Sequence, residues 1–206
     1  MANPIENVEY QGWFYEKRDV RCRMILDIKR SNAGGTPDLM VVMMNPGGSR
    51  PEKDGEDNAR DFVKTKEDLT QHQILAVMRA CEYKYARVLN LSDIREVESP
   101  QFYNRLKDGD FWHSIFSPTR KDDLKNRFID TDNVPVLVAW GVDPKLSPLI
   151  NLAMQFLRKE NIFGIPKKEE SYQYYHPLVR KPFTKKEWVT KIVKMLKNRN
   201  PSHSGN

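Results

Sequence analysis

Leu39-Met-Val-Val-Met-Met-Asn-Pro-Gly-Gly-Ser49 contains an unbroken apolar run that stops abruptly at a turn. Such a run, bounded by Pro and Gly, is typical of a strand buried on both faces of a sheet. Similar short runs occur at residues 86–91, 134–139 and 161–165, with helical patterns between them. This alternation predicts an α/β fold with helices on both faces of the sheet.

The expected helices begin at recognisable capping residues. Thr70-Gln-His-Gln73 resembles a capping box, Ser147-Pro148 is a favourable N-cap and N1 pair, and Thr184-Lys-Lys-Glu187 is a second capping box. Residues 10–30 read as an N-terminal β-hairpin, because an aromatic run and a partly alternating run flank a short turn. The charged residues 50–66 are expected to form a mobile loop, and whether it acts as an ordered lid stays open.

Length and composition predict one domain. The chain has 206 residues, of which 39% are hydrophobic and 30% charged. We expect a single α/β domain over residues 1–199, with the hairpin at 10–30, the main core at 39–199 and a disordered tail at 200–206. No apolar stretch approaches the roughly 18 residues of a membrane helix, and the N-terminus lacks signal-peptide features, so we expect a cytoplasmic protein without a membrane partner.

The spacing of the cysteines and histidines and the distribution of charge limit the classes of function that the protein could have. The two cysteines, Cys22 and Cys81, read as buried thiols, and no Cys or His cluster has metal-ligand spacing, so we expect neither a metal nor a cofactor. The net charge is +6, and the excess is concentrated in residues 184–199. That basic helix face is either a solvated surface or a contact for nucleic acid.

The residues that come after the strands are the place to look for a site, because α/β sheets bind ligands beyond the carboxyl ends of their strands. Asn45 is either part of a plain turn or an amide that positions a water or a base edge. His176 is either a loop histidine with a satisfied nitrogen or a donor to an oxyanion or phosphate. Charged loop carboxylates are either solvated or general bases (Asp54, Asp57, Asp61), and Tyr174 and Tyr175 could stack on a base.

Four motifs carry a resemblance that covers residues 12–196: Val41-Val-Met-Met-Asn-Pro-Gly-Gly-Ser49, Val88-Leu-Asn-Leu91, Val136-Leu-Val-Ala-Trp-Gly141 and His176-Pro-Leu178. Together they resemble a bacterial and phage family catalogued as domain of unknown function 1643. That pattern is in turn similar to the uracil-DNA glycosylase superfamily. The resemblance implies a three-layer α/β/α fold around a mostly parallel, four-stranded sheet, with the N-terminal β-hairpin as an addition.

The resemblance also implies roles for individual residues. Asn45 would hold the attacking water, His176 would stabilise charge on the departing base, and these two are the expected catalytic residues. Asn90 matches the base-reading asparagine approximately, and Leu178 stands in place of the family's serine, with Leu178 or Val179 as the wedge. The remaining expected substrate-binding residues are Pro46, Gly47, Gly48, Ser49, Asp93, Trp140, Gly141, Tyr175 and Pro177, and the expected nucleic-acid contacts are Lys185, Lys186 and Lys191.

The leading hypothesis is a protein that binds a nucleobase or nucleotide and acts as a glycosylase-like hydrolase of N-glycosidic bonds, although the residues alone leave catalysis open. Its partner would be DNA or a nucleotide. A second hypothesis is a non-catalytic nucleic-acid-binding module that uses the basic face of residues 185–199. A third is a small-molecule nucleotide-binding enzyme or sensor on the same scaffold, and a fourth is an α/β domain that binds another protein.

Overall fold

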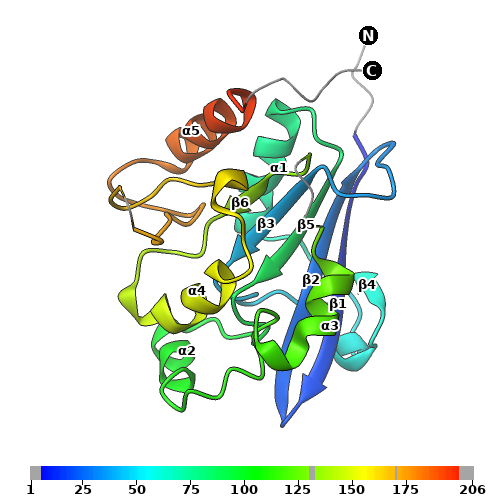
Figure 1. Cartoon of the computed structure of the whole chain (residues 1–206). Helices are drawn as coiled ribbons and strands as arrows, with labels where there is room; N and C mark the ends of the chain where they lie inside the picture. The colour runs from blue at the N-terminus through cyan, green and yellow to red at the C-terminus, as the bar shows by residue number, and fades with distance from the viewer. Residues whose placement is uncertain (1–5, 130–132, 170, 200–206) are drawn as a thin grey trace.

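Within the part of the chain that the structure describes, a seven-stranded sheet has helices on both sides (Figure 1). The computed structural model describes residues 6–129, 133–169 and 171–199, so the expected tail at 200–206 lies outside the described residues. The strands are β1 (Val8–Lys17), β2 (Val20–Arg30), β3 (Leu39–Met43), β4 (Phe62–Lys64), β5 (Tyr85–Asn90), β6 (Val136–Val138) and β7 (Ile162–Phe163). The α-helices are α1 (Leu69–Ala80), α2 (Ser99–Arg105), α3 (Lys121–Arg127), α4 (Ser147–Met154) and α5 (Lys185–Lys197).

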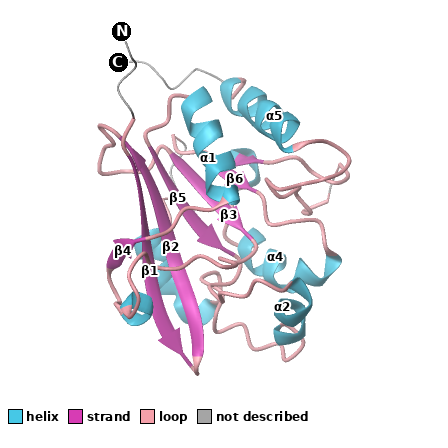
Figure 2. Ribbon diagram, turned by 180° about the vertical axis from the view of Figure 1, so that it is seen from behind, coloured by secondary structure: helices cyan, strands magenta, loops and turns pink. Residues whose placement is uncertain are grey.

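The helices form two layers that bury opposite faces of the sheet. Helices α1 and α5 pack on one face, in a cluster that includes Val41 and Trp188. Helices α2, α3 and α4 pack on the other face, in a cluster that includes Val42 and Phe102. Figure 2 shows the molecule from behind and brings α1 to the front, whereas α3 is in front in Figure 1. The expected α/β class is therefore confirmed.

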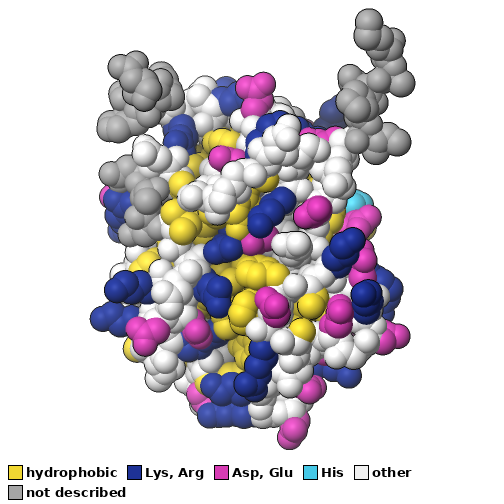
Figure 3. Space-filling model, turned by 90° about the vertical axis from the view of Figure 1, so that its right-hand side faces the viewer, with side chains coloured by type: hydrophobic (Ala, Val, Ile, Leu, Met, Phe, Trp, Pro, Cys, Tyr) yellow, Lys and Arg dark blue, Asp and Glu magenta, His cyan; other side chains and the backbone are white. Residues whose placement is uncertain are grey.

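The strand order is β4-β1-β2-β5-β3-β6-β7. Strands β5, β3, β6 and β7 are parallel, and they occupy the four positions expected from the apolar runs. Over the described residues, the sheet nevertheless has seven strands and not four. The hairpin of β1 and β2 joins it, because β2 pairs antiparallel with β5 through contacts such as Leu26 with Val88. Figure 3 shows the surface of the molecule next to β4 and β1, the outer strands of this antiparallel half. Hydrophobic side chains lie there between Lys and Arg side chains.

Two segments differ from the sequence-based expectations. The charged loop at 50–66 contains β4, which pairs with β1 and closes that edge of the sheet. Helix α1 begins after Asp68, whose carboxylate accepts a hydrogen bond from the Gln71 N–H, so Thr70 is not the cap. Ser147 is likewise the first residue of α4, because a 3₁₀ turn precedes it. An aspartate or a preceding turn can satisfy the first N–H groups of a helix as well as a serine or threonine does.

Two local expectations are confirmed, one for β3 and one for the start of α5. All five residues of β3 are buried. Thr184 and Glu187 form both hydrogen bonds of the capping box at the start of α5. Both Cys22 and Cys81 are free thiols, but only Cys22 is buried as expected, whereas Cys81 is half-buried. In the described ranges, none of the helices has the length and apolar character needed to cross a membrane.

A bulge in β2 determines which face of the sheet Arg23 occupies. Trp13 pairs with Ile25 and Phe14 pairs with Arg23, so Met24 is an extra residue in β2. Met24 and Ile25 both pack toward the α2–α4 side. A bulge reverses the alternation of side chains beyond it. Arg23 consequently lies on the same face as Leu26, beneath α1.

Candidate functional site

A cavity of about 370 Å³ lies where β3 and β5 end. The end of β3 and its turn, the central and last residues of β5, the bulged part of β2, the start of α1 and two loops all contribute to its wall. It brings together three residues that the sequence analysis selected, namely Asn45, Asn90 and His176. The cavity also takes in Pro46, Gly47, Gly48 and Leu178. Because these residues come from distant parts of the chain, only the fold makes them neighbours.

His176 is held as a neutral hydrogen-bond donor. Its Nδ1 accepts a hydrogen bond from the backbone N–H of Leu178 at 3.2 Å. In a neutral imidazole, an accepting Nδ1 places the proton on Nε2. Burial lowers the pKa of His176 to about 4, although Asp68 opposes that change. At neutral pH the ring therefore offers an Nε2–H donor and no positive charge.

Asn45 is anchored through its amino group. Nδ2 donates to the carbonyl oxygens of Ile94 at 3.2 Å and Glu96 at 2.7 Å. These two bonds tie the turn after β3 to the loop after β5 and set the orientation of the amide. The turn itself depends on Gly47, which has a φ of +57° and leaves the backbone open to the cavity. The Oδ1 atom of Asn45 is left as a hydrogen-bond acceptor.

Asn90 is oriented by a residue that sequence reasoning missed. Asn90 is only 1% exposed, and its Oδ1 accepts a hydrogen bond from Arg23 Nη2 at 2.9 Å. Arg23 is 3% exposed and forms no ion pair within the described part of the chain. Burial lowers the pKa of Arg23 to about 10, so the guanidinium stays charged at neutral pH. The available signal was an arginine directly before the apolar run Met24-Ile-Leu26 of the hairpin.

Helix α1 contributes a second residue that was not predicted. Gln71 is 4% exposed and lines the cavity from the first turn of α1. Neither atom of its side-chain amide has a partner among the described residues. Asp68 lies beside it and caps the helix. The pattern Thr70-Gln-His-Gln73 drew attention to this turn as a helix start, but it did not reveal that Gln71 faces a ligand-sized space.

Apolar side chains surround the mouth of the cavity. Leu69 at the start of α1 is 61% exposed and Val97 after β5 is 69% exposed. Both line the cavity together with Leu178, the residue expected to act as a wedge. Large apolar side chains this exposed are suited to contact with a partner surface.

The other expected substrate-binding residues lie elsewhere. Asp93 is fully buried and pairs with Arg120 at 2.6 Å. The Trp140 indole is in the core and donates to the Tyr172 carbonyl oxygen at 2.7 Å. Ser49, Gly141, Tyr175 and Pro177 also lie outside the cavity wall. Asp93 and Trp140 lie outside the cavity because they are buried between the layers. The pattern of residues at strand ends does not reveal such burial.

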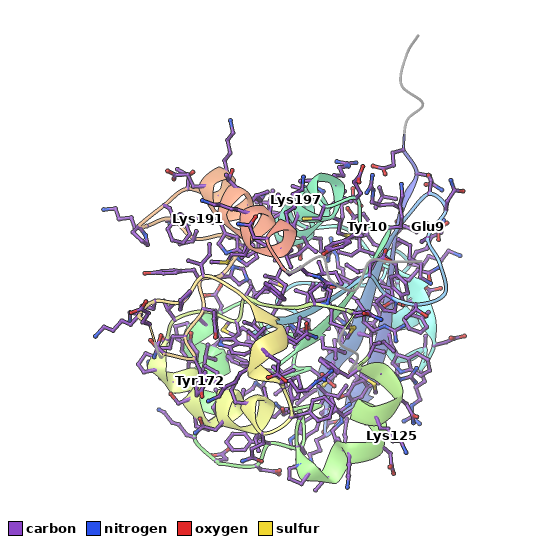
Figure 4. All side chains as sticks on the ribbon, turned by 45° about the horizontal axis from the view of Figure 1, so that its top comes forward. Glu9, Tyr10, Lys125, Tyr172, Lys191 and Lys197 are labelled. Atoms are coloured by element: carbon purple, nitrogen blue, oxygen red, sulfur yellow. The ribbon has the colours of Figure 1, made fainter. Side chains whose placement is uncertain are left out.

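The charged groups that were considered as bases or nucleic-acid contacts are also outside the cavity. Asp54 and Asp61 are exposed, and Asp57 forms an ion pair with Arg95. The expected contacts on α5 are exposed to solvent (Lys185, Lys186, Lys191). Figure 4 shows Lys191 and Lys197 on this helix. The structure therefore leaves the lysine face and the cavity as two separate surfaces.

Within the described ranges, no group of three or more His, Cys, Asp or Glu side chains could hold a metal ion. No family model matches the chain, and no curated protein or solved structure matches it. The glycosylase resemblance therefore remains a hypothesis that must be argued from the cavity.

Proposed function

We propose that the cavity binds a nucleobase and that the protein hydrolyses the N-glycosidic bond of the bound nucleotide. The observation that carries the proposal is the convergence of Asn45, Asn90 and His176 on one cavity at the carboxyl ends of β3 and β5. A water-orienting acceptor, a base-contacting amide and a neutral donor are the groups that such a reaction needs. Apolar side chains form most of the remaining wall and suit the faces of a flat base.

The reaction separates charge in a defined direction. The bond between the sugar carbon and the base nitrogen breaks, and its electron pair goes to the base. His176 Nε2–H donates to the base oxygen on which that negative charge accumulates. A water molecule adds to the sugar carbon, and its proton goes to the departing base or to solvent. Asn45 Oδ1 accepts a hydrogen bond from this water and orients it, while a base within a duplex must first be flipped out.

An abasic-site assay tests the proposal. Single- and double-stranded oligonucleotides that contain hypoxanthine, uracil, guanine or an alkylated base are incubated with the protein and then treated with alkali. We expect cleavage by the wild type and its loss in Asn45→Ala and His176→Ala. His72→Ala is the matched control, because His72 lies on the exposed face of α1. Thermal melts of all variants check that they fold.

Two results would favour a different function. Salt-sensitive binding of oligonucleotides that survives both Asn45→Ala and His176→Ala but is lost when the α5 lysines are replaced would favour the non-catalytic binding module. Binding of free nucleosides without any cleavage of oligonucleotides would favour a nucleotide-binding enzyme or sensor.

A further inference from the structure

Three buried side chains in the cavity wall have polar atoms without partners. They are Arg23 Nε, Asn90 Nδ2 and both amide atoms of Gln71, judged over the described residues. Each of these residues is less than one-twentieth exposed. Buried polar groups are nearly always hydrogen-bonded, so three exceptions on one cavity indicate that a ligand completes them.

The hydrogen bond between Arg23 and Asn90 determines which polar atoms this part of the cavity presents to a ligand. Because Asn90 Oδ1 already accepts from Arg23, the atom left for a ligand is the Nδ2 donor. Arg23 has donors only. The carboxylates of Asp68 and Asp93 favour its charge through space, but neither forms an ion pair with it. The region around Arg23 and Asn90 is thus positively charged and rich in donors.

Two acceptors of the cavity have other roles, whereas Gln71 Oε1 remains an acceptor without a partner among the described residues. Asn45 Oδ1 orients water in the proposed reaction, and the Asp68 carboxylate accepts from the Gln71 backbone N–H at 2.8 Å. His176 contributes a further donor. A base that enters between the apolar walls therefore meets Arg23 and Asn90 with hydrogen-bond acceptors.

Common bases differ in whether two acceptors lie side by side. Uracil places its N3–H donor between its two carbonyl oxygens. The N7 acceptor of adenine lies beside the donating N6 amino group, whereas the N7 of guanine lies beside the accepting O6. Hypoxanthine shares the O6 and N7 edge of guanine. Arginine binds this edge through two parallel hydrogen bonds, which is its commonest specific contact with a base.

We propose that the cavity selects 6-oxopurines over adenine and uracil, with Arg23 and Asn90 Nδ2 facing the O6 and N7 edge. This inference rests on the proposed function, because it names the base that the same cavity accepts. The selectivity comes from the β-hairpin, since the bulge at Met24 brings Arg23 to the cavity.

Calorimetric titration with deoxynucleosides tests this selectivity. We expect deoxyinosine and deoxyguanosine to bind about ten- to a hundredfold more tightly than deoxyadenosine and deoxyuridine. The probe 7-deaza-deoxyguanosine lacks the N7 acceptor and should bind about tenfold more weakly than deoxyguanosine. Arg23→Met should abolish the preference for deoxyinosine over deoxyadenosine. Arg21→Met, on the exposed side of the same strand, should leave it unchanged.

The outcomes separate this inference from the proposed function. Deoxyuridine or deoxyadenosine binding as tightly as deoxyinosine would overturn the selectivity and leave nucleobase binding intact. An unchanged preference in a folded Arg23→Met variant would also overturn it. Arg23→Lys keeps the charge without the planar fork, so it should retain binding but lose most of the discrimination. If none of the nucleosides binds and no oligonucleotide is cleaved, the proposed function fails, and the selectivity fails with it.

Discussion

Replacing Arg23 with methionine should leave the protein as stable as the wild type or make it more stable. Burial lowers the pKa of Arg23 from 12.5 to about 10. At about 1.4 kcal/mol for each pKa unit, burying the charge destabilises the fold by about 3 kcal/mol. Arg23→Met removes that penalty and keeps an apolar chain of similar length. It also leaves Asn90 Oδ1 without its donor, which costs about 1–3 kcal/mol.

The net change in the free energy of unfolding is therefore between zero and a gain of about 2 kcal/mol. Urea unfolding at pH 7 measures it, and a thermal melt should show a rise of about 2–4 °C for each kcal/mol gained. If Arg23 instead stabilised the fold, Arg23→Met would lower the free energy of unfolding. A loss of more than about 2 kcal/mol would show that Arg23 has a structural role and would refute the reasoning.

Arg87→Met provides the matched contrast. Arg87 donates to both carboxylate oxygens of Asp27, at 2.8 and 2.9 Å. Asp27 is 2% exposed, so removing Arg87 leaves a buried carboxylate without its cation. We expect a loss of about 3–5 kcal/mol. The same substitution at two arginines of one sheet should thus have opposite effects, because one charge is paired and the other is not.

The site supports three further predictions. Burial lowers the pKa of both His176 and His113 to about 4. As the pH drops, the unfolded chain therefore takes up protons before the folded protein does, and the free energy of unfolding in urea should fall between pH 6.5 and about pH 4. Equal stability at pH 7 and pH 4.5 would contradict this. Asp68→Ala removes the cap of α1 and should lower the unfolding free energy by about 1 kcal/mol, and an unchanged urea midpoint would argue against the cap. Leu69→Asp and Val97→Asp at the cavity mouth should weaken duplex binding about tenfold in anisotropy titrations while nucleoside binding stays the same; a parallel loss of both would mean that the cavity itself is disturbed.

The parallel half of the sheet could be predicted because its signal is local. The runs of β3, β5, β6 and β7 each stand out without knowledge of their neighbours. Since parallel strands end at a common edge, the residues after them were expected to meet, and Asn45, Asn90 and His176 do line one cavity. That expectation needed only the positions of the strand ends.

The rest of the site depends on pairings that single segments do not encode. The aromatic run and the partly alternating run indicate a hairpin, but they do not show that β2 pairs with β5 or that a bulge turns Arg23 toward α1. Trp140 comes after β6 as Asn45 comes after β3, yet its indole finds a carbonyl in the core and not a ligand. Asp93 likewise meets Arg120 and Tyr15 instead of the cavity. Side-chain partners of this kind are set by packing between layers.

Strand β5 lies between the parallel and the antiparallel half of the sheet. This position explains how the Asn90 amide can lie near groups from both halves. On one side β5 pairs in parallel with β3, which places Asn90 opposite Met43, close to the Asn45 turn. On the other side it pairs antiparallel with β2, from which Arg23 fixes the Asn90 amide. The groups assigned to the reaction thus come from the parallel half, and the group that orients the base-contacting amide comes from the hairpin. A change in base preference would then require substitutions in β2 and not in Asn45 or His176.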